Sequence, residues 1–392
     1  MFIDVHVHFR DPGYPDREDF KSGTMAAAAG GFTCIGDMPN PNPSTTNPQA
    51  YVEKRKIAES KALIDFMLYG GTGHKSIENI SSLSDMGARA FKTYTTSKYE
   101  DLSTTSPAAL LQILKETKAN KRLLMIHSED QSIVDLATQE AKNLKMKGFP
   151  AHAFSRPKNA EDLMTSLAVD TAEFTSSTIY LCHVSSTQSI NKVREAKKRG
   201  AKIFAETCPH YLTLTEKDGA SLGSYGKTNP PLRLEQDRLA LWRGLNDGTL
   251  DVVSSDHCPY TKEEKNAGWE DIFEAPPGMP GLETNVPIMM THLQNGHITL
   301  SRLVEVFSEN PSKIFGIFPR KGSLNVGSDA DITIIDPKTR GKIKGVEHYT
   351  KAKTSMFEGK EFQGAPKATF VRGELVMEDG LILNMENHGK FV

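Results

Sequence analysis

Two histidines separated by a single residue, His6 and His8, lie in the apolar segment FIDVHVHF near the start of the sequence. Successive side chains of a strand point to opposite faces, so two imidazoles at this spacing point the same way. Such a pair could hold one metal ion from a single strand. The spacing alone does not distinguish a metal site from two ordinary histidines on a half-buried strand.

Three further residues of ligand type come at the ends of apolar segments. His127 ends RLLMIH, His183 ends IYLCH, and Asp256 follows DVVSS. If these segments are strands of a barrel, their carboxyl ends meet at one mouth, where barrel enzymes keep their sites. Four imidazoles and a carboxylate there are suitable ligands for a metal such as zinc. By strand alternation, Cys182 is expected to face the helices and not the metal.

Lys92 lies in AFKTY, at the end of a fourth apolar segment. A lysine that points into a barrel is costly unless it is paired or modified. Its neutral amine can react with CO2, and the resulting carbamate is an anion that could bridge two metals about 3.5–4 Å apart. The alternative is a surface lysine at a strand end, and the residue pattern by itself favours that alternative.

The elements that must position these residues are eight short apolar segments, several of them followed by helical ones. The predicted strands are 2–8, 32–38, 63–69, 88–94, 122–127, 178–183, 201–206 and 251–255. The predicted helices include 48–61, 107–118, 186–199 and 235–246. Eight βα units in one run favour an α/β fold with a closed (β/α)8 barrel of the TIM type over an open sheet.

From residue 321 onward the pattern changes to the alternation and turns of antiparallel strands, in SLNVGSDADITIIDP and ATFVRGELVMEDGLIL. A barrel of this type takes about 250 residues, so a chain of 392 residues has room for one barrel and a small addition. We therefore expect two parts, the barrel at 1–320 and a β appendage at 321–392.

Composition excludes several classes of partner. The formal net charge is −2 and no basic run occurs, so we expect binding neither to nucleic acid nor to an anionic membrane. No signal peptide and no long apolar span are recognisable. The four cysteines are scattered, which favours reduced thiols and a cytoplasmic protein.

A series of motifs between residues 4 and 337 resembles the cyclic amidohydrolases of the amidohydrolase superfamily, a group that includes dihydroorotases, allantoinases and hydantoinases. In chain order the motifs are DVHVHFRDPG, DMPN, AFKTY, MIHSED, LCHVSS, ETCPHYL, TNPPLR, SSDHCP and PGMPGLET. The resemblance implies a distorted (β/α)8 barrel with a small β-sandwich built from both chain ends. Here the HxH pair already comes at His6, so we expect a reduced sandwich.

The same resemblance implies a role for each ligand-type residue. His6 and His8 would bind the more buried of two Zn2+ ions, and His127 and His183 would bind the second. Lys92 would be carboxylated and bridge both ions. Asp256 would bind the first ion and act as the general acid–base.

Four more residues bear on the substrate. In dihydroorotases the positions that match Arg10 and Asn40 hold the substrate carboxylate, and Asn229 in TNPPLR would bind the ring. Tyr260 stands where dihydroorotases usually have a second histidine, so this stretch reads partly like a hydantoinase. The alternative for Arg10 is an ordinary salt bridge with Asp11 or Asp16.

The resemblance therefore implies dihydroorotase activity, the zinc-dependent reversible hydrolysis of (S)-dihydroorotate to N-carbamoyl-L-aspartate in de novo pyrimidine (UMP) biosynthesis. The alternatives are an allantoinase, a hydantoinase or dihydropyrimidinase, and a non-catalytic scaffold homologue. The expected partner is a small-molecule substrate. A homo-oligomer and an association with aspartate carbamoyltransferase stay open.

Overall fold

A ring of parallel strands forms the centre of the molecule. The computed structural model describes residues 1–96, 100–383 and 387–392. Within these ranges the ring contains β1 (Phe2–Val7), β2 (Phe32–Asp37), β3 (Asp65–Leu68) with β4 (Gly70–Gly71), β5 (Ala90–Tyr94), β6 (Leu123–His127), β7 (Ile179–Leu181), β8 (Ile203–Thr207) and β9 (Val252–Val253). Each of the eight predicted strands is present, although the third is interrupted at Tyr69.

The ring closes between its first and last strands. β3 pairs with β2, whereas its continuation β4 pairs with β5. Beyond β9, His257 forms a parallel bridge with Val7, and the His8 amide donates to the His257 carbonyl at 2.8 Å. The strands are buried on both faces, as expected for a parallel sheet covered by helices. The fold is therefore a TIM-type barrel.

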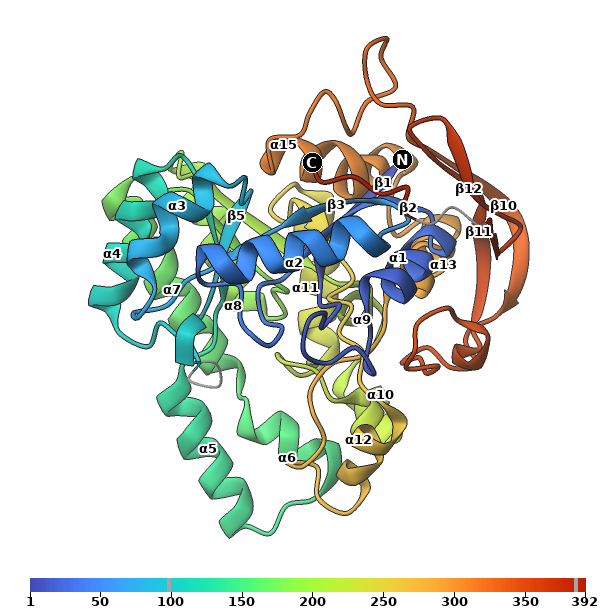
Figure 1. Ribbon diagram of the computed structural model, residues 1–392. Coiled ribbons are helices and arrows are strands. Elements are labelled where there is room, and N and C mark those ends of the chain that lie inside the picture. The colour runs from blue at the N-terminus through green and yellow to red at the C-terminus, as the bar shows by residue number, and fades with distance from the viewer. Residues whose placement is uncertain (97–99, 384–386) are drawn as a thin grey trace.

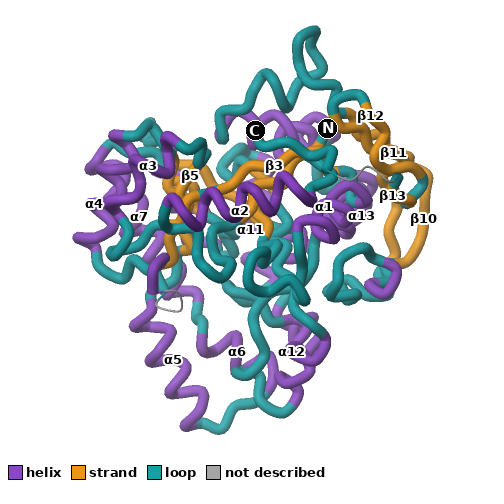
Figure 2. The backbone as a smooth tube through the Cα atoms, in the orientation of Figure 1, coloured by secondary structure: helices purple, strands orange, loops and turns teal. Residues whose placement is uncertain are grey.

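Helices surround the ring (Figures 1 and 2). Their start signals are local: Asn47 accepts a hydrogen bond from the Ala50 amide at the start of α2, and Asp130 accepts one from Ile133 at the start of α5. The α-helices are α1 (Phe20–Ala29), α2 (Pro48–Lys61), α3 (Ile80–Asp85), α4 (Pro107–Ala119), α5 (Gln131–Asn143), α6 (Gly148–Ser155), α7 (Lys158–Thr175), α8 (Thr187–Lys198), α9 (Pro209–Thr213), α10 (Glu216–Leu222), α11 (Glu235–Asn246), α12 (Lys262–Asn266), α13 (Leu282–Gln294), α14 (Leu300–Val304) and α15 (Asn310–Ile314).

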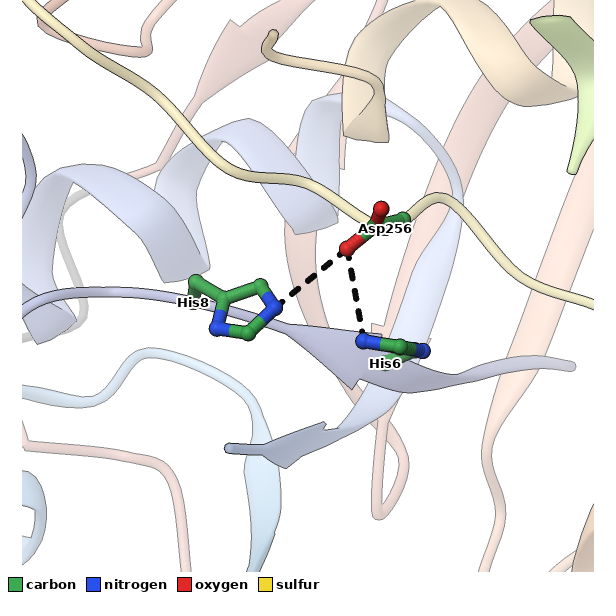
Figure 3. A group of neighbouring side chains, drawn as sticks. All are labelled: His6, His8 and Asp256. Carbon is green, nitrogen blue, oxygen red and sulfur yellow. Dashed lines mark ion pairs between the residues drawn. The ribbon is translucent and has the colours of Figure 1, made fainter. Parts of the chain in front are cut away.

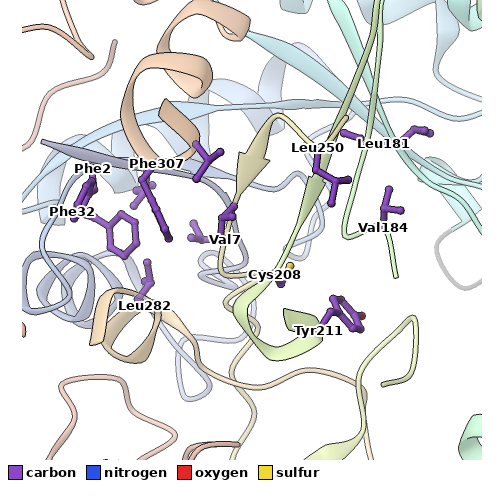
Figure 4. Packing of buried hydrophobic residues seen from close by; sticks show 14 of the residues in the cluster. Phe2, Val7, Phe32, Leu181, Val184, Cys208, Tyr211, Leu250, Leu282 and Phe307 are labelled. Carbon is purple, nitrogen blue, oxygen red and sulfur yellow. The ribbon is translucent and has the colours of Figure 1, made fainter. Parts of the chain in front are cut away.

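Two apolar layers hold the barrel together. The inner one fills the ring with side chains such as Val5, Met67 and Tyr180. The outer one lies between strands and helices, and Figure 4 shows the part of it around Val7 and Phe307. No helix within the described ranges has both the length and the apolar character that crossing a membrane would require.

The appendage is an antiparallel sheet with the strand order β10 (Ile332–Lys342), β11 (Glu361–Val371), β12 (Glu374–Glu378) and β13 (Leu381–Ile382). It packs on α13 through β11 (Figure 1). A buried ion-pair cluster ties it to the barrel, because Lys321 Nζ lies 2.5 Å from Asp65 of β3 and 2.6 Å from Asp331. The antiparallel appendage is thus confirmed, whereas the boundary at residue 320 stays a prediction.

Candidate active site

The predicted site residues converge on one pocket at the carboxyl ends of the strands. Nine of them line it: His6, His8, Arg10, Asn40, His127, His183, Asn229, Asp256 and Tyr260. The other lining residues are Tyr94, Thr96, Cys258, Pro277 and Gly278. Lys92 is fully buried beside this pocket, and its Nζ lies 5.0 Å from the centre of the Tyr94 ring. The structure therefore brings the predicted set together from strands that are far apart in sequence.

His6, His8 and Asp256 form the first group of possible metal ligands (Figure 3). The Nε2 atoms of both histidines lie 3.3 Å from Asp256 Oδ1. Two ligand atoms held tetrahedrally by one zinc ion are about 3.3 Å apart, given bond lengths of about 2.0–2.1 Å. Two imidazoles and a carboxylate also suit zinc chemically. The donor set and its spacing therefore fit a metal ion.

His127 and His183 form the second group. His127 Nδ1 faces His183 Nε2 at 2.9 Å, and the His183 ring lies 5.5 Å from the His6 ring, centre to centre. Burial lowers the pKa of both imidazoles, so their nitrogens carry lone pairs. Within the described residues, His183 Nδ1 has no hydrogen-bond partner. Two neutral ring nitrogens that face each other fit a cation placed between them.

Polar groups behind the histidines fix their orientation. Glu206 accepts from His6 Nδ1, and it also accepts from the Tyr180 hydroxyl at 2.7 Å. Asn40 Oδ1 lies 2.6 Å from His8 Nδ1, which assigns the proton to that nitrogen. Both contacts leave the Nε2 lone pairs directed toward Asp256, as in many metal sites where the other ring nitrogen donates to an oxygen.

Glu129 fixes the orientation of His127 in the same way. Its Oε2 lies 2.7 Å from His127 Nε2 and 2.6 Å from Arg156 Nη2. Burial works against the charge of Glu129, but Arg156 and His127 hold its pKa well below the ordinary value. The sequence reasoning did not identify Glu129 or Glu206, although both lie in motifs that it used, MIHSED and ETCPHYL.

The charges around His6 favour a cation. Burial works against ionisation of Asp256, but His6 and His8 hold its pKa far below the usual range. Burial likewise opposes protonation of His6, yet Glu206 and Asp256 raise its pKa well above the ordinary value. His8, in contrast, has its pKa lowered to about 3 by burial. The site thus places the neutral His8 beside a charged carboxylate, and the two carboxylates around His6 stabilise positive charge there, whether a proton or a metal cation.

Three residues of the site adopt left-handed backbone conformations. The φ angles are 62° at Arg10, 35° at His183 and 48° at Asp256. Such conformations cost on the order of 1–3 kcal/mol each for residues with a side chain, and they cluster at functional sites. Each of them follows the end of a strand, where the turn of the backbone redirects the side chain into the mouth.

The prediction for Cys182 is wrong. Its side chain faces the barrel interior, where Sγ lies 2.9 Å from Lys92 Nζ. Cys182 continues the alternation of β7, in which Tyr180 faces the interior and Leu181 faces the helices, whereas His183 departs from it with a positive φ. Cys182 and His183 therefore both point inward.

Arg10 is held at the rim of the pocket. Its Nη2 atom donates to Tyr260 Oη at 2.9 Å and contacts Cys258 Sγ at 2.7 Å. Asp11, the alternative partner considered from sequence, forms an ion pair with Lys61 at 2.6 Å. Asn229 Oδ1 has no hydrogen-bond partner among the described residues. Arg10, Asn40, Asn229 and Tyr260 thus surround the ligand groups with polar atoms.

Histidines and a carboxylate at the strand ends of a barrel form an arrangement suited to metal-assisted hydrolysis. Residues 2–376 match the amidohydrolase family, and the chain belongs to it. The chain is 34% identical over 393 residues to an L-hydantoinase of Paenarthrobacter aurescens, covering 100% of this chain and 86% of that protein. It is also 34% identical over 392 residues to a dihydroorotase of Methanothermobacter thermautotrophicus, with the same coverage of both chains.

A solved structure also matches the whole of this chain. The L-hydantoinase (dihydropyrimidinase) from Arthrobacter aurescens superimposes with a TM-score of 0.97 and 34% identity, covering 100% of this chain and 87% of that one. The resemblance to cyclic amidohydrolases is thereby confirmed. Relatives of both kinds are found at the same level of identity, so the comparisons do not choose between their substrates.

Glu206→Gln is expected to weaken the affinity for divalent metal by about 10- to 100-fold, as is typical when the group behind a metal-binding histidine is changed. The amide removes the negative charge that supports His6 as a ligand. Competition with a chelator, followed by elemental analysis, measures the effect. Glu140→Gln, at an exposed position on α5, is the matched control. Equal affinity of both variants would contradict this role of Glu206.

Proposed function

We propose that the protein is a dihydroorotase, which hydrolyses the ring of (S)-dihydroorotate to N-carbamoyl-L-aspartate and catalyses the reverse closure in pyrimidine (UMP) biosynthesis. The observation that carries this proposal is the place of Arg10 and Asn40. A guanidinium and a carboxamide line the same pocket as the candidate metal ligands. Dihydroorotate bears a carboxylate beside its ring amide, and a guanidinium can bind a carboxylate through two hydrogen bonds.

The proposed cofactor is a pair of Zn2+ ions. His6, His8 and Asp256 would hold one, and His127 and His183 would hold the other. Lys92, fully buried close to Cys182, would be carboxylated and supply the anionic bridge. When bound, the metals would polarise the scissile carbonyl and lower the pKa of a water molecule.

Asp256 has the properties of the group that moves the proton. Its carboxylate is held in the charged form and faces the pocket. As the water oxygen bonds to the ring carbonyl carbon, Asp256 would accept the proton that the water loses. When the carbon–nitrogen bond breaks, it would return this proton to the ring nitrogen, which leaves Asp256 charged for the next cycle.

The remaining polar groups would orient the ring. Arg10 would pair with the substrate carboxylate, and the Nδ2 group of Asn40 would donate to it, because the Oδ1 atom of Asn40 already accepts from His8. Asn229 Oδ1 would accept from a ring N–H. Holding the ring in one pose lowers the entropic part of the barrier.

A second candidate, a hydantoinase or dihydropyrimidinase, is favoured by Tyr260. Its hydroxyl accepts from Arg10 Nη2, so one guanidinium donor already has a protein partner. An allantoinase would use the same neutral-ring chemistry. A scaffold homologue without activity is disfavoured, because the chain retains the complete ligand set. A homo-oligomer, an association with aspartate carbamoyltransferase and a cytoplasmic location stay predictions.

Asp256→Asn is expected to lower turnover by several orders of magnitude while the fold is retained, because an amide cannot accept the proton. Single-turnover kinetics with metal content measured on the same sample separate lost chemistry from lost metal. Asp170→Asn, which makes the same change at an exposed position on α7, is the matched control. Turnover of Asp256→Asn near the wild-type rate would assign the proton transfer to another group.

Substrate choice is tested by kcat/KM for dihydroorotate, hydantoin and allantoin. Arg10→Met is expected to reduce the value for dihydroorotate by about 30-fold to several thousand-fold, since losing a charge-assisted contact at a desolvated site costs about 2–5 kcal/mol. Tyr260→Phe removes one neutral hydrogen bond worth about 0.5–1.5 kcal/mol and should cost about tenfold or less. A wild-type preference for hydantoin or allantoin would overturn the dihydroorotase proposal in favour of the second candidate.

A further inference from the structure

Helix α2 carries two lysines that reach toward the segments bearing Arg10 and Asn40. Lys54 and Lys61 are separated by about two helical turns, so they lie on similar faces of α2. Figures 1 and 2 show α2 running alongside the sheet of β1, β2 and β3. Neither lysine lines the pocket. Any effect of theirs on the substrate must therefore pass through other residues.

Lys54 acts on both segments through one buried ion pair. Its Nζ lies 2.6 Å from Asp37 Oδ2 and donates to the Met38 carbonyl at 2.7 Å. Asp37 Oδ1 in turn accepts from the Phe9 amide at 2.8 Å. Lys54 and Asp37 are both essentially inaccessible to solvent. The pair therefore joins the residue before Arg10 to the Met38–Asn40 turn.

Lys61 holds the other side of Arg10. Its Nζ lies 2.6 Å from Asp11 Oδ2, which also accepts weakly from the Phe20 amide at 3.4 Å. Arg10, with a φ of 62°, is thus enclosed between two anchored neighbours, Phe9 and Asp11. A strained residue of this kind keeps its conformation only when its surroundings determine it.

The same contacts engage two carboxylates, that of Asp11 beside Arg10 in the sequence and that of Asp37, whose charged form Arg10 also favours. Burial raises the pKa of Asp37, whereas Lys54 and, more weakly, Arg10 favour its charged form. Without the lysines, Asp37 and Asp11 would lose their counter-charges, and Arg10 would become a competing partner for both. A guanidinium drawn toward them would be turned away from a substrate carboxylate.

We propose that Lys54 and Lys61 are positioning residues for Arg10 and Asn40, and that they thereby set the affinity of the site for a ring that bears a carboxylate. This inference rests on the proposed dihydroorotase function. It assigns no chemistry to the lysines. The effect of losing them is therefore expected in substrate binding and not in the chemical step.

The first test uses Lys61, whose side chain is about one-third exposed; its loss leaves the Asp11 carboxylate, only 6% exposed, without a counter-charge, so thermal unfolding is measured beside the kinetics. Lys61→Met is expected to raise KM for dihydroorotate about tenfold and to change kcat by less than about twofold. This pattern is expected when an interaction that is equally strong in the ground state and in the transition state is lost. Lys61→Arg keeps the positive charge and should restore the wild-type KM. Lys56→Met, at an exposed position of the same helix, is the matched control and should change neither constant.

The second test concerns Lys54, whose replacement alone leaves Asp37 buried without a counter-charge. Lys54→Met is therefore combined with Asp37→Asn, which removes both charges and can keep the acceptor for the Phe9 amide. The double variant should also show a raised KM, and metal content is measured on the same sample because Asn40 also contacts His8. Thermal unfolding of each variant shows that the protein examined is folded.

The outcomes separate the two proposals. Wild-type protein without turnover of dihydroorotate would overturn the proposed function and this inference with it. If the wild-type protein turns over dihydroorotate, any one of three results would overturn the positioning role alone. These are an unchanged KM in Lys61→Met, a loss confined to kcat, and no recovery of KM in Lys61→Arg. A raised KM that Lys61→Arg reverses supports the inference.

Discussion

The barrel buries two charged carboxylates on either side of the His6 imidazole, and this accumulation of negative charge is the constraint on which the site depends. Asp4 and Glu206 are inaccessible to solvent, and the Asp256 side chain is only 11% exposed. Burial raises the pKa of Asp4 to about 7, but Glu206 and Asp256 stay charged because His6 lies between them. Buried carboxylates are costly unless cations or hydrogen-bond donors neutralise them. A divalent metal beside His6 would satisfy this requirement.

Two sets of residues support the site, one behind the candidate metal-ligand histidines and one around the groups proposed to bind the substrate. Glu206, Asn40 and Glu129 orient the histidines from behind, and these contacts come from the strand ends themselves. The groups proposed to select the substrate come from the segments after β1 and β2, which α2 secures from outside the ring. Asn40 belongs to both sets, since its oxygen orients His8 while its nitrogen is available to the substrate. In the proposed function, one carboxamide would therefore link metal binding to ring recognition.

Sequence reasoning predicted the strands and the converging ligands because buried parallel strands are short apolar segments and barrel sites lie at their ends. It failed for Cys182 because alternation was counted from His183, whose positive φ breaks it, whereas Cys182 follows Tyr180 to the interior. It did not find Glu206 or Glu129, because a carboxylate behind a histidine has no spacing of its own. The interruption at Tyr69 was also missed, as a kink in an apolar segment leaves no pattern. Substrate choice depends on how Arg10 and Tyr260 meet in space, which the sequence does not show.

The central claim is that the strand-end residues hold two metal ions joined through Lys92. Elemental analysis of wild-type protein and of Lys92→Ala, both purified without chelator, tests it most directly. The account predicts about two zinc ions per wild-type chain, since two cations so close together need an anionic bridge, and a clear loss of metal from Lys92→Ala. A wild-type content near zero that added zinc does not restore, or an unchanged content in Lys92→Ala, would contradict it.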